Sequence, residues 1–264
     1  AALYCPEAAS IDSQQYVYEL ASDAKAAGVE FYMGHTAQGG EITTSEVTLA
    51  TDKGAVTGEF LINTAGLYAD KLAAEFDVGT DYRIIPFRGD YYETVPERRH
   101  LCNTMIYPTP DPELPFLGVH YTRRTDGKVI VGPNAVLAFA REAYKNTDFD
   151  IAELIDVFSF KGFWKLMTSK KMINVAMDEL NKSYRKEKFV QASQKLVPEA
   201  EEQDFVKSYA GVRAQLVTDD GELVKDPMTV SGPRSLHVLN AVSPGLTCSL
   251  PYGEHVAEQA VEEI

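Results

Sequence analysis

Two arginines stand in surroundings suited to binding a carboxylate. Arg213 follows a glycine and a valine at the end of a strand-like segment, and Arg88 lies between a phenylalanine and a glycine. A guanidinium is planar and presents a rigid fork of donors, so it can hold a carboxylate through two parallel hydrogen bonds, which a lysine cannot do. The alternative is an ordinary ion pair, because the chain has 39 acidic side chains and Arg88 is close in sequence to Asp90 and Glu93.

One histidine on a predicted strand is suited to proton transfer. His120 follows Gly118 and Val119 in a segment of alternating polarity, and an imidazole titrates near neutral pH. A single histidine on a strand also commonly serves the fold, and that alternative stays open. For the remaining histidines, which lie in loops, at strand starts or on the last helix, an ordinary structural or solvent-facing role is favoured; they are His35, His100, His237 and His255.

Two turns rich in small residues would let a ligand approach the backbone closely. The first consists of Asn63, Thr64, Ala65 and Gly66. The second contains Ser243, Gly245, Leu246 and Thr247. The second turn precedes the last predicted helix, whose unpaired N–H groups and positive dipole end can stabilise an anion. The alternatives are tight packing of a strand on a helix for the first turn and a simple helix cap for the second.

Apolar spacing predicts the elements that position these residues. Helices are expected at Ser13–Ala27, with Asp12 or Ser13 as its cap and Gly28 as its end, and at 67–76, within 150–197 and at 246–264. Strands are expected at 29–33, 46–50, 56–62, 84–95, 116–123, 128–131, 208–217 and 236–240. The order predicts an α+β fold in which a partial doubly wound layer is interrupted by an antiparallel sheet with helices.

Composition excludes several classes of function. The formal net charge of −14 opposes binding to nucleic-acid phosphates. No apolar run reaches the roughly 18 residues of a spanning helix. The three cysteines are far apart and follow neither a disulfide nor a zinc pattern, so no metal is expected and a reducing compartment, the cytoplasm, is favoured.

Several segments resemble one family closely. They are INTAGLYADKLA (Ile62–Ala73), PFRGDYYE (Pro86–Glu93), IYPTPDPELPFLGVHYTRRTDGKVIVGPNAVLAFAREAY (Ile106–Tyr144), AGVRAQL (Ala210–Leu216) and HVLNAVSPGLTCSLPYGEHVAE (His237–Glu258). Together they resemble the L-2-hydroxyglutarate dehydrogenase/oxidase branch of the D-amino-acid-oxidase-like FAD-dependent oxidoreductases. The resemblance covers nearly the whole chain, and its most specific part is Ile106–Tyr144.

The resemblance implies an activity and assigns roles. It implies oxidation of L-2-hydroxyglutarate, or a similar 2-hydroxy acid, to the 2-keto acid, with FAD as hydride acceptor. Arg213 would bind a substrate carboxylate, Arg88 would bind the distal carboxylate or the flavin, and His120 would be the catalytic base. The two small-residue turns defined above would contact FAD.

One departure from the family concerns the cofactor. The glycine-rich G-x-G-x-x-G turn that binds the FAD pyrophosphate is not found in the 264 residues. We therefore expect an N-terminally truncated chain, with residues 1–80 as a remnant of the FAD-binding domain joined to the start of the substrate domain. Residues 81–210 would complete the substrate domain, and 211–264 would return to the FAD-binding domain.

This departure predicts that the chain alone lacks tightly bound FAD, since only secondary cofactor contacts remain. The measurement is the flavin released when the purified chain is denatured. One flavin released per chain would contradict the prediction.

Other interpretations stay open. A related flavin oxidoreductase acting on glycerol 3-phosphate or an amino acid is one, and an inert fragment or binding module is another. The resemblance leaves the electron acceptor open between oxygen and a quinone. A peripheral contact with the inner membrane would use a lysine-rich helical surface, although a solvated helix face is the default for it. Its lysines are Lys161, Lys165, Lys170, Lys171, Lys182 and Lys186.

Overall fold

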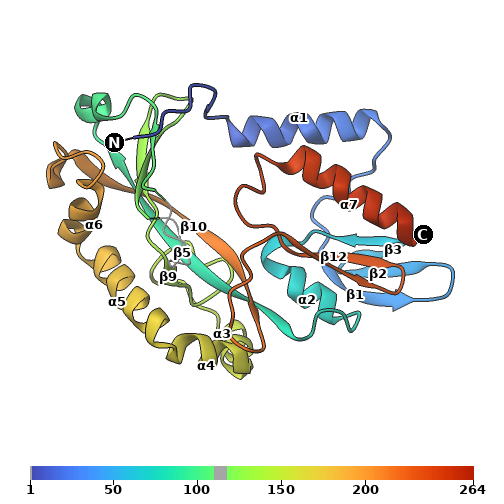
Figure 1. Ribbon diagram of the computed structural model, residues 1–264. Coiled ribbons are helices and arrows are strands. Elements are labelled where there is room, and N and C mark those ends of the chain that lie inside the picture. The colour runs from blue at the N-terminus through green and yellow to red at the C-terminus, as the bar shows by residue number, and fades with distance from the viewer. Residues whose placement is uncertain (1, 110–117) are drawn as a thin grey trace. The chain divides into compact units, whose positions relative to one another are not determined.

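The computed structural model describes residues 2–109 and 118–264, which form two compact units (Figure 1). Each unit is assembled from three separate segments of the chain. The first unit comprises Ala1–Phe31, Arg88–Val136 and Asn174–Gly211, and the second comprises Tyr32–Phe87, Leu137–Ile173 and Val212–Ile264. The functional division predicted from the sequence, with boundaries after residues 80 and 210, stays a prediction.

The first unit is built on an antiparallel sheet. Its strands follow the order β10-β5-β8-β7-β6, and β9 pairs with β5. The strands are β5 (Tyr82–Thr94), β6 (Met105–Ile106), β7 (His120–Arg123), β8 (Val129–Gly132), β9 (Val136–Leu137) and β10 (Phe205–Thr218). Strands β5 and β10 are long, and each continues into the second unit. The core of the first unit contains Tyr121 and Val131 from the sheet with Phe189 and Val190 from α6 (Lys186–Ser193).

The second unit contains two three-stranded sheets. One is the antiparallel meander of β1 (Ala37–Ile42), β2 (Val47–Thr51) and β3 (Gly54–Gly58). The other has the order β11-β12-β4, in which β12 (Ser235–Asn240) runs parallel to β4 (Leu61–Asn63) and antiparallel to β11 (Met228–Gly232).

Helices cover both faces of the β11-β12-β4 sheet (Figure 1). Leu236 and Val238 pack against Val256 of α7 (Ser249–Glu263), whereas Leu239 belongs to a cluster with Ala73 of α2 (Ala69–Ala74). The alternation along β12 therefore gives each helix its own apolar face. The remaining helices of the described chain are α1 (Ser13–Ala26), α3 (Ile151–Ser159), α4 (Lys161–Thr168), α5 (Lys170–Tyr184) and the short 3-10 turns η1 (Gly66–Tyr68), η2 (Pro96–Leu101) and η3 (Glu202–Asp204).

The mixed helix and sheet class is confirmed, and so is most of the element order. The antiparallel pairing predicted between 84–95, 116–123 and 128–131 is confirmed for its described part, because β5 pairs with β8 and β8 with β7; residues 116 and 117 lie outside the described residues. Asp12 caps α1 by accepting from two backbone N–H groups, and Gly28 ends it with φ +94°. The doubly wound layer in its detail stays a prediction.

Three predictions of local structure were wrong, and two strands were missed. Residues 29–33 are not a strand, and their large apolar side chains are exposed. The segment 56–62 divides between β3 and β4, which belong to different sheets. Strands β1 and β11 were not predicted. The last helix begins at Ser249 and not at residue 246, because the residues before it form a turn in which the Cys248 N–H donates to the Pro244 carbonyl oxygen.

Candidate functional site

A groove of about 580 Å³ lies within the second unit. Three segments that are far apart in the sequence form its walls: the turn after β4, the middle of β10, and β12 with the turn and helix that follow it. Arg213 was expected at the end of a strand, but β10 continues past it to Thr218. The lining includes Thr64 and Gly66 from the first segment, Arg213 from the second, and Ser243 and Gly245 from the third. Five residues predicted for binding on sequence grounds thus lie around one groove.

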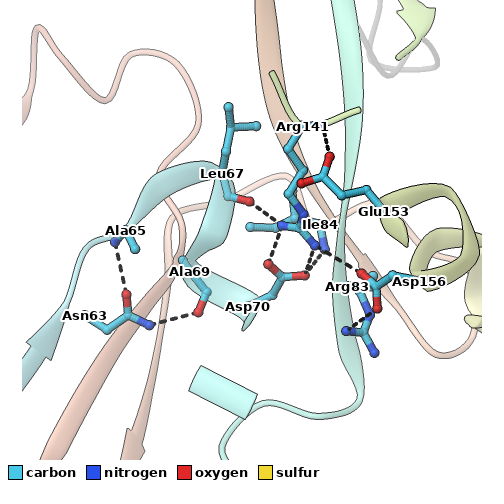
Figure 2. Close-up of polar contacts among 10 residues, drawn as sticks. All are labelled: Asn63, Ala65, Leu67, Ala69, Asp70, Arg83, Ile84, Arg141, Glu153 and Asp156. Carbon is cyan, nitrogen blue, oxygen red and sulfur yellow. Dashed lines mark hydrogen bonds and ion pairs between the residues drawn. The ribbon is translucent and has the colours of Figure 1, made fainter. Parts of the chain in front are cut away.

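The first wall is shaped by Asn63, the last residue of β4. Its side chain is 1% exposed. The amide oxygen accepts from the Ala65 N–H at 3.0 Å, and the amide nitrogen donates to the Ala69 carbonyl oxygen at 2.8 Å (Figure 2). Asn63 therefore holds the turn from inside. Gly66 adopts φ +57°, a conformation that favours glycine, and an added Cβ there would find no atom within 4 Å.

The third wall depends on Gly245. A Cβ at this position would lie 2.8 Å from the Ala241 carbonyl oxygen, so only glycine allows this close turn. The Gly245 N–H donates to the Val242 carbonyl oxygen at 2.9 Å, and the Thr247 hydroxyl donates to the Pro244 carbonyl oxygen at 3.1 Å. Thr247 therefore stabilises the turn.

Four of the predicted cofactor residues are not among the residues described as lining the groove. They are Asn63, Ala65, Leu246 and Thr247. Two of them, Asn63 and Thr247, make the hydrogen bonds within the turns described above. Sequence reasoning placed the turns correctly but could not separate the residues that shape a turn from those that face the groove.

The groove has the features expected of a site for a largely apolar group. Small side chains and backbone form much of the lining, and two glycines allow close approach. Tyr252 also lines the groove, and its buried hydroxyl has no hydrogen-bond partner among the described residues. Burial raises the pKa of Tyr252, so the hydroxyl is neutral near pH 7 and keeps its proton to donate.

A buried ion-pair network stands behind the first wall, and sequence reasoning missed it (Figure 2). The Arg141 side chain is 1% exposed, and its two terminal nitrogens contact the two carboxylate oxygens of Asp70 at 2.6 and 2.9 Å. Arg141 also donates to the carbonyl oxygen of Leu67, a groove residue. The only signal in the sequence was an arginine within an apolar segment, and no local pattern identifies a partner 71 positions away.

Two further carboxylates complete this network. Asp156 lies 3.4 Å from Arg141 and 3.1 Å from Arg83, and Glu153 accepts from the Arg141 backbone N–H at 2.6 Å. Burial disfavours the charge on Arg141, but hydrogen bonds and charges from Asp70, then Asp156 and Glu153, outweigh this effect and raise the pKa of Arg141. The charged network fixes the η1 and α2 segment that carries the first wall.

His120 lies in the first unit at the start of β7. Its Nδ1 is 3.0 Å from the Gly118 carbonyl oxygen, and its ring stacks on Tyr107 with centroids 4.4 Å apart. A carbonyl oxygen only accepts, so Nδ1 carries the hydrogen and the neutral ring keeps its lone pair on Nε2. This tautomer suits proton uptake at Nε2. His120 and Arg213 belong to different units, and their joint action stays a proposal.

Arg88 is also in the first unit and is 6% exposed. Its Nε lies 3.2 Å from Asp90, so the ion pair considered from the sequence is present. Asp90 is held in turn by the hydroxyl of Ser183 at 2.8 Å and the amide of Asn134 at 3.3 Å. This buried set fixes the direction of the Arg88 side chain.

Three of the lysines considered for a membrane surface are ion-paired. Lys161 pairs with Asp219, Lys165 with Asp220, and Lys182 with Asp178 and Glu179. Across the described residues no helix is long and apolar enough to cross a membrane. Nor do these residues contain a group of three or more His, Cys, Asp or Glu side chains that could hold a metal ion.

Comparison with known families matches a model of FAD-dependent oxidoreductases to residues 1–259. The chain belongs to this family. Its curated relatives include an L-2-hydroxyglutarate dehydrogenase of Indibacter alkaliphilus, 39% identical over 99% of this chain and 65% of the relative. The L-2-hydroxyglutarate dehydrogenase of an Escherichia coli strain is 34% identical over 97% of this chain and 61% of the relative. The mitochondrial L-2-hydroxyglutarate dehydrogenase of Mus musculus is 36% identical over 98% of this chain and 59% of the relative.

The chain thus spans less than two thirds of the length of these relatives. Among solved structures, the FAD-bound L-alpha-glycerophosphate oxidase of Mycoplasma pneumoniae matches with a TM-score of 0.63 and 19% identity, covering 92% of this chain and 54% of that one. At this identity the match establishes the fold alone. The resemblance to FAD-dependent oxidoreductases inferred from the sequence is confirmed.

Proposed function

We propose that the protein containing this chain oxidises L-2-hydroxyglutarate, or a similar 2-hydroxy acid, to the 2-keto acid, with FAD as its cofactor. One observation carries the proposal: Arg213 lines the same groove as the two small-residue turns. The names of relatives at 34–39% identity support the choice of substrate. The substrate, its electron acceptor and any membrane contact belong to the proposal.

The groove residues fit the cofactor. Thr64, Gly66, Ser243 and Gly245 would hold it, because their small side chains leave backbone within reach, and Tyr252 would supply a buried hydroxyl donor. When bound, FAD supplies the acceptor for the hydride that leaves the 2-carbon of the substrate. Because the glycine-rich pyrophosphate turn is not found in these residues, we expect the chain alone to bind FAD weakly.

The charged residues would handle the substrate. Arg213 would bind one carboxylate through its guanidinium, and Arg88, directed by Asp90, would bind the second. His120 would accept the hydroxyl proton on Nε2 while the C–H bond breaks, so that the carbon–oxygen double bond forms from the electrons of the O–H bond. These three roles require the two units to act together.

The test is anaerobic reduction of the flavin in the purified, FAD-loaded protein. L-2-hydroxyglutarate should bleach the flavin absorbance, whereas its D enantiomer should not. L-lactate, which lacks the second carboxylate, should react much more slowly. Bleaching by glycerol 3-phosphate or an amino acid, without reaction of any 2-hydroxy acid, would support the rival activity.

The role of Arg213 can be tested by Arg213→Lys. We expect kcat/KM for the hydroxy acid to fall roughly tenfold to a hundredfold, which corresponds to about 1.5–3 kcal/mol for a lost charge-assisted pair. Flavin content should not change. Arg124→Lys, at an exposed arginine paired with Asp126, is the matched control. Equal kinetics in the two variants would assign Arg213 to structure.

A further inference from the structure

His237 lies in the middle of β12 and is fully buried. Its neighbours in register are Asn63 on β4 and Val230 on β11. The residues on either side of it in the sequence, Leu236 and Val238, face α7, so alternation turns the imidazole to the opposite face, where its ring centroid lies 6.0 Å from that of Phe76. The function proposed above does not use this histidine.

The partner of the imidazole is Asn63, whose amide orientation is fixed. The Nδ1 atom of His237 lies 3.0 Å from the Asn63 amide nitrogen. That amide oxygen accepts from the Ala65 N–H and the nitrogen donates to the Ala69 carbonyl oxygen, as described above. A flipped amide would set donor against donor at Ala65 and acceptor against acceptor at Ala69. Asn63 must therefore present an N–H to the imidazole.

This orientation determines the state of the ring. Because Asn63 donates, Nδ1 has to accept, and the hydrogen of the neutral imidazole is on Nε2. Nε2 is buried and has no hydrogen-bond partner among the described residues. Burial lowers the pKa of His237, in agreement with a neutral ring.

We propose that His237 is a positioning residue: its neutral imidazole accepts a hydrogen bond from Asn63 and so fixes the turn at 63–66 that forms the first wall of the groove. The effect on a cofactor rests on the proposed function, whereas the effect on the turn does not. The link is short, since Asn63 holds Ala65 and Ala69 while Thr64 and Gly66 line the groove.

Protonation of His237 would place an N–H at Nδ1 against the N–H of Asn63. The neighbouring strands β4 and β11 carry no charged residue. Helix α2 and its C-cap carry three charged side chains. Asp70 is paired with Arg141, Lys71 is the next residue in the helix, and the C-cap residue Glu75 lies against Gly39. The contact should therefore contribute its full stability above the ordinary histidine pKa of about 6.5 and lose it as the pH falls below that value.

Two substitutions of His237 distinguish the contribution of its hydrogen-bond acceptor from that of its side-chain volume. His237→Leu removes the acceptor, whereas His237→Asn can place a carbonyl oxygen near the position of Nδ1. We expect His237→Leu to weaken FAD binding roughly tenfold, as for the loss of one buried hydrogen bond, and His237→Asn to recover most of it. In both, the fall in stability of this unit below pH 6.5 should become shallower. Val47→Ala, a core change on β2, is the control for general destabilisation.

Nitrogen-15 NMR of the imidazoles in the unaltered protein supplies an independent measurement. We expect His237 to be neutral at pH 7, with its hydrogen on Nε2. A hydrogen on Nδ1, or the same FAD affinity and pH profile in His237→Leu and Val47→Ala, would overturn the proposal. If the unaltered protein that contains this chain binds no FAD, the proposed function fails, but the NMR tautomer and the pH profile still decide the role of His237.

Discussion

Replacing Asp70 with asparagine is expected to lower the free energy of unfolding of the second unit by about 3–5 kcal/mol, the usual cost of removing one partner from a buried ion pair. The Arg141 guanidinium would stay buried, and among the described residues its remaining carboxylate partner would be Asp156 at 3.4 Å. Asp70 also accepts from the Ile84 backbone N–H at 2.9 Å, so the substitution disturbs β5 as well (Figure 2).

Urea unfolding followed by the fluorescence of Trp164 measures this effect. Trp164 is the single tryptophan of the chain and lies in the same unit as Asp70. The matched control is Asp220→Asn, which removes a carboxylate from the exposed pair with Lys165 and should change the unfolding midpoint little. Equal shifts in the two variants would show that the Arg141 network does not stabilise the unit.

His120→Asn in the FAD-loaded protein is expected to lower kcat by roughly 10²–10⁴ fold, the usual contribution of a positioned base. Asparagine can keep a hydrogen bond to the Gly118 carbonyl oxygen but cannot take up a proton at the position of Nε2. The acidic limb of the pH–rate profile, where a base loses its lone pair to a proton, should disappear. Stopped-flow reduction of the flavin by L-2-hydroxyglutarate measures both effects.

A matched control exists for this substitution. The Nδ1 of His100 lies 3.0 Å from the Glu97 carbonyl oxygen, the same kind of contact, on an exposed 3-10 turn. His100→Asn should leave the kinetics unchanged. If His120→Asn reduces kcat no more than His100→Asn does, His120 returns to the structural interpretation that the sequence also allowed.

Sequence patterns predicted those helices and strands that are determined by neighbouring residues in the sequence. The Asp12 cap and Gly28 end of α1 depend on neighbouring residues, and β5 is rich in isoleucine and aromatic residues, which favour strands. Strand β1 was missed because its sequence AQGGEI contains two glycines and only one strand-forming residue, Ile42. Strand β1 needs glycine at position 40 because β2 lies close to it: a Cβ there would lie 2.1 Å from the Thr48 carbonyl oxygen. Only the paired strand reveals that requirement.

The same distinction applies to the candidate site: some residues that line the groove could be predicted from the sequence, but the residues that support them could not. Small-residue turns and an arginine on a strand can be recognised from residue types, and Thr64, Gly66, Arg213 and Gly245 do line one groove, although β10 does not end at Arg213 as expected. The residues that support them could not be recognised. Arg141 and His237 act through partners 71 and 174 positions away, and spacing along the sequence carries no information about such pairs.

The parallel pairing of β4 with β12 also has a consequence for biosynthesis. Asn63 of β4 and its partner in register, His237 of β12, are 174 positions apart, and β4 pairs with no strand other than β12 in the described part of its sheet. Until residues 235–245 have been synthesised, β4 has no strand to pair with in this sheet and the groove lacks its third wall. The groove is therefore completed only after these residues have emerged from the ribosome, and a ligand that needs all three walls can bind only then.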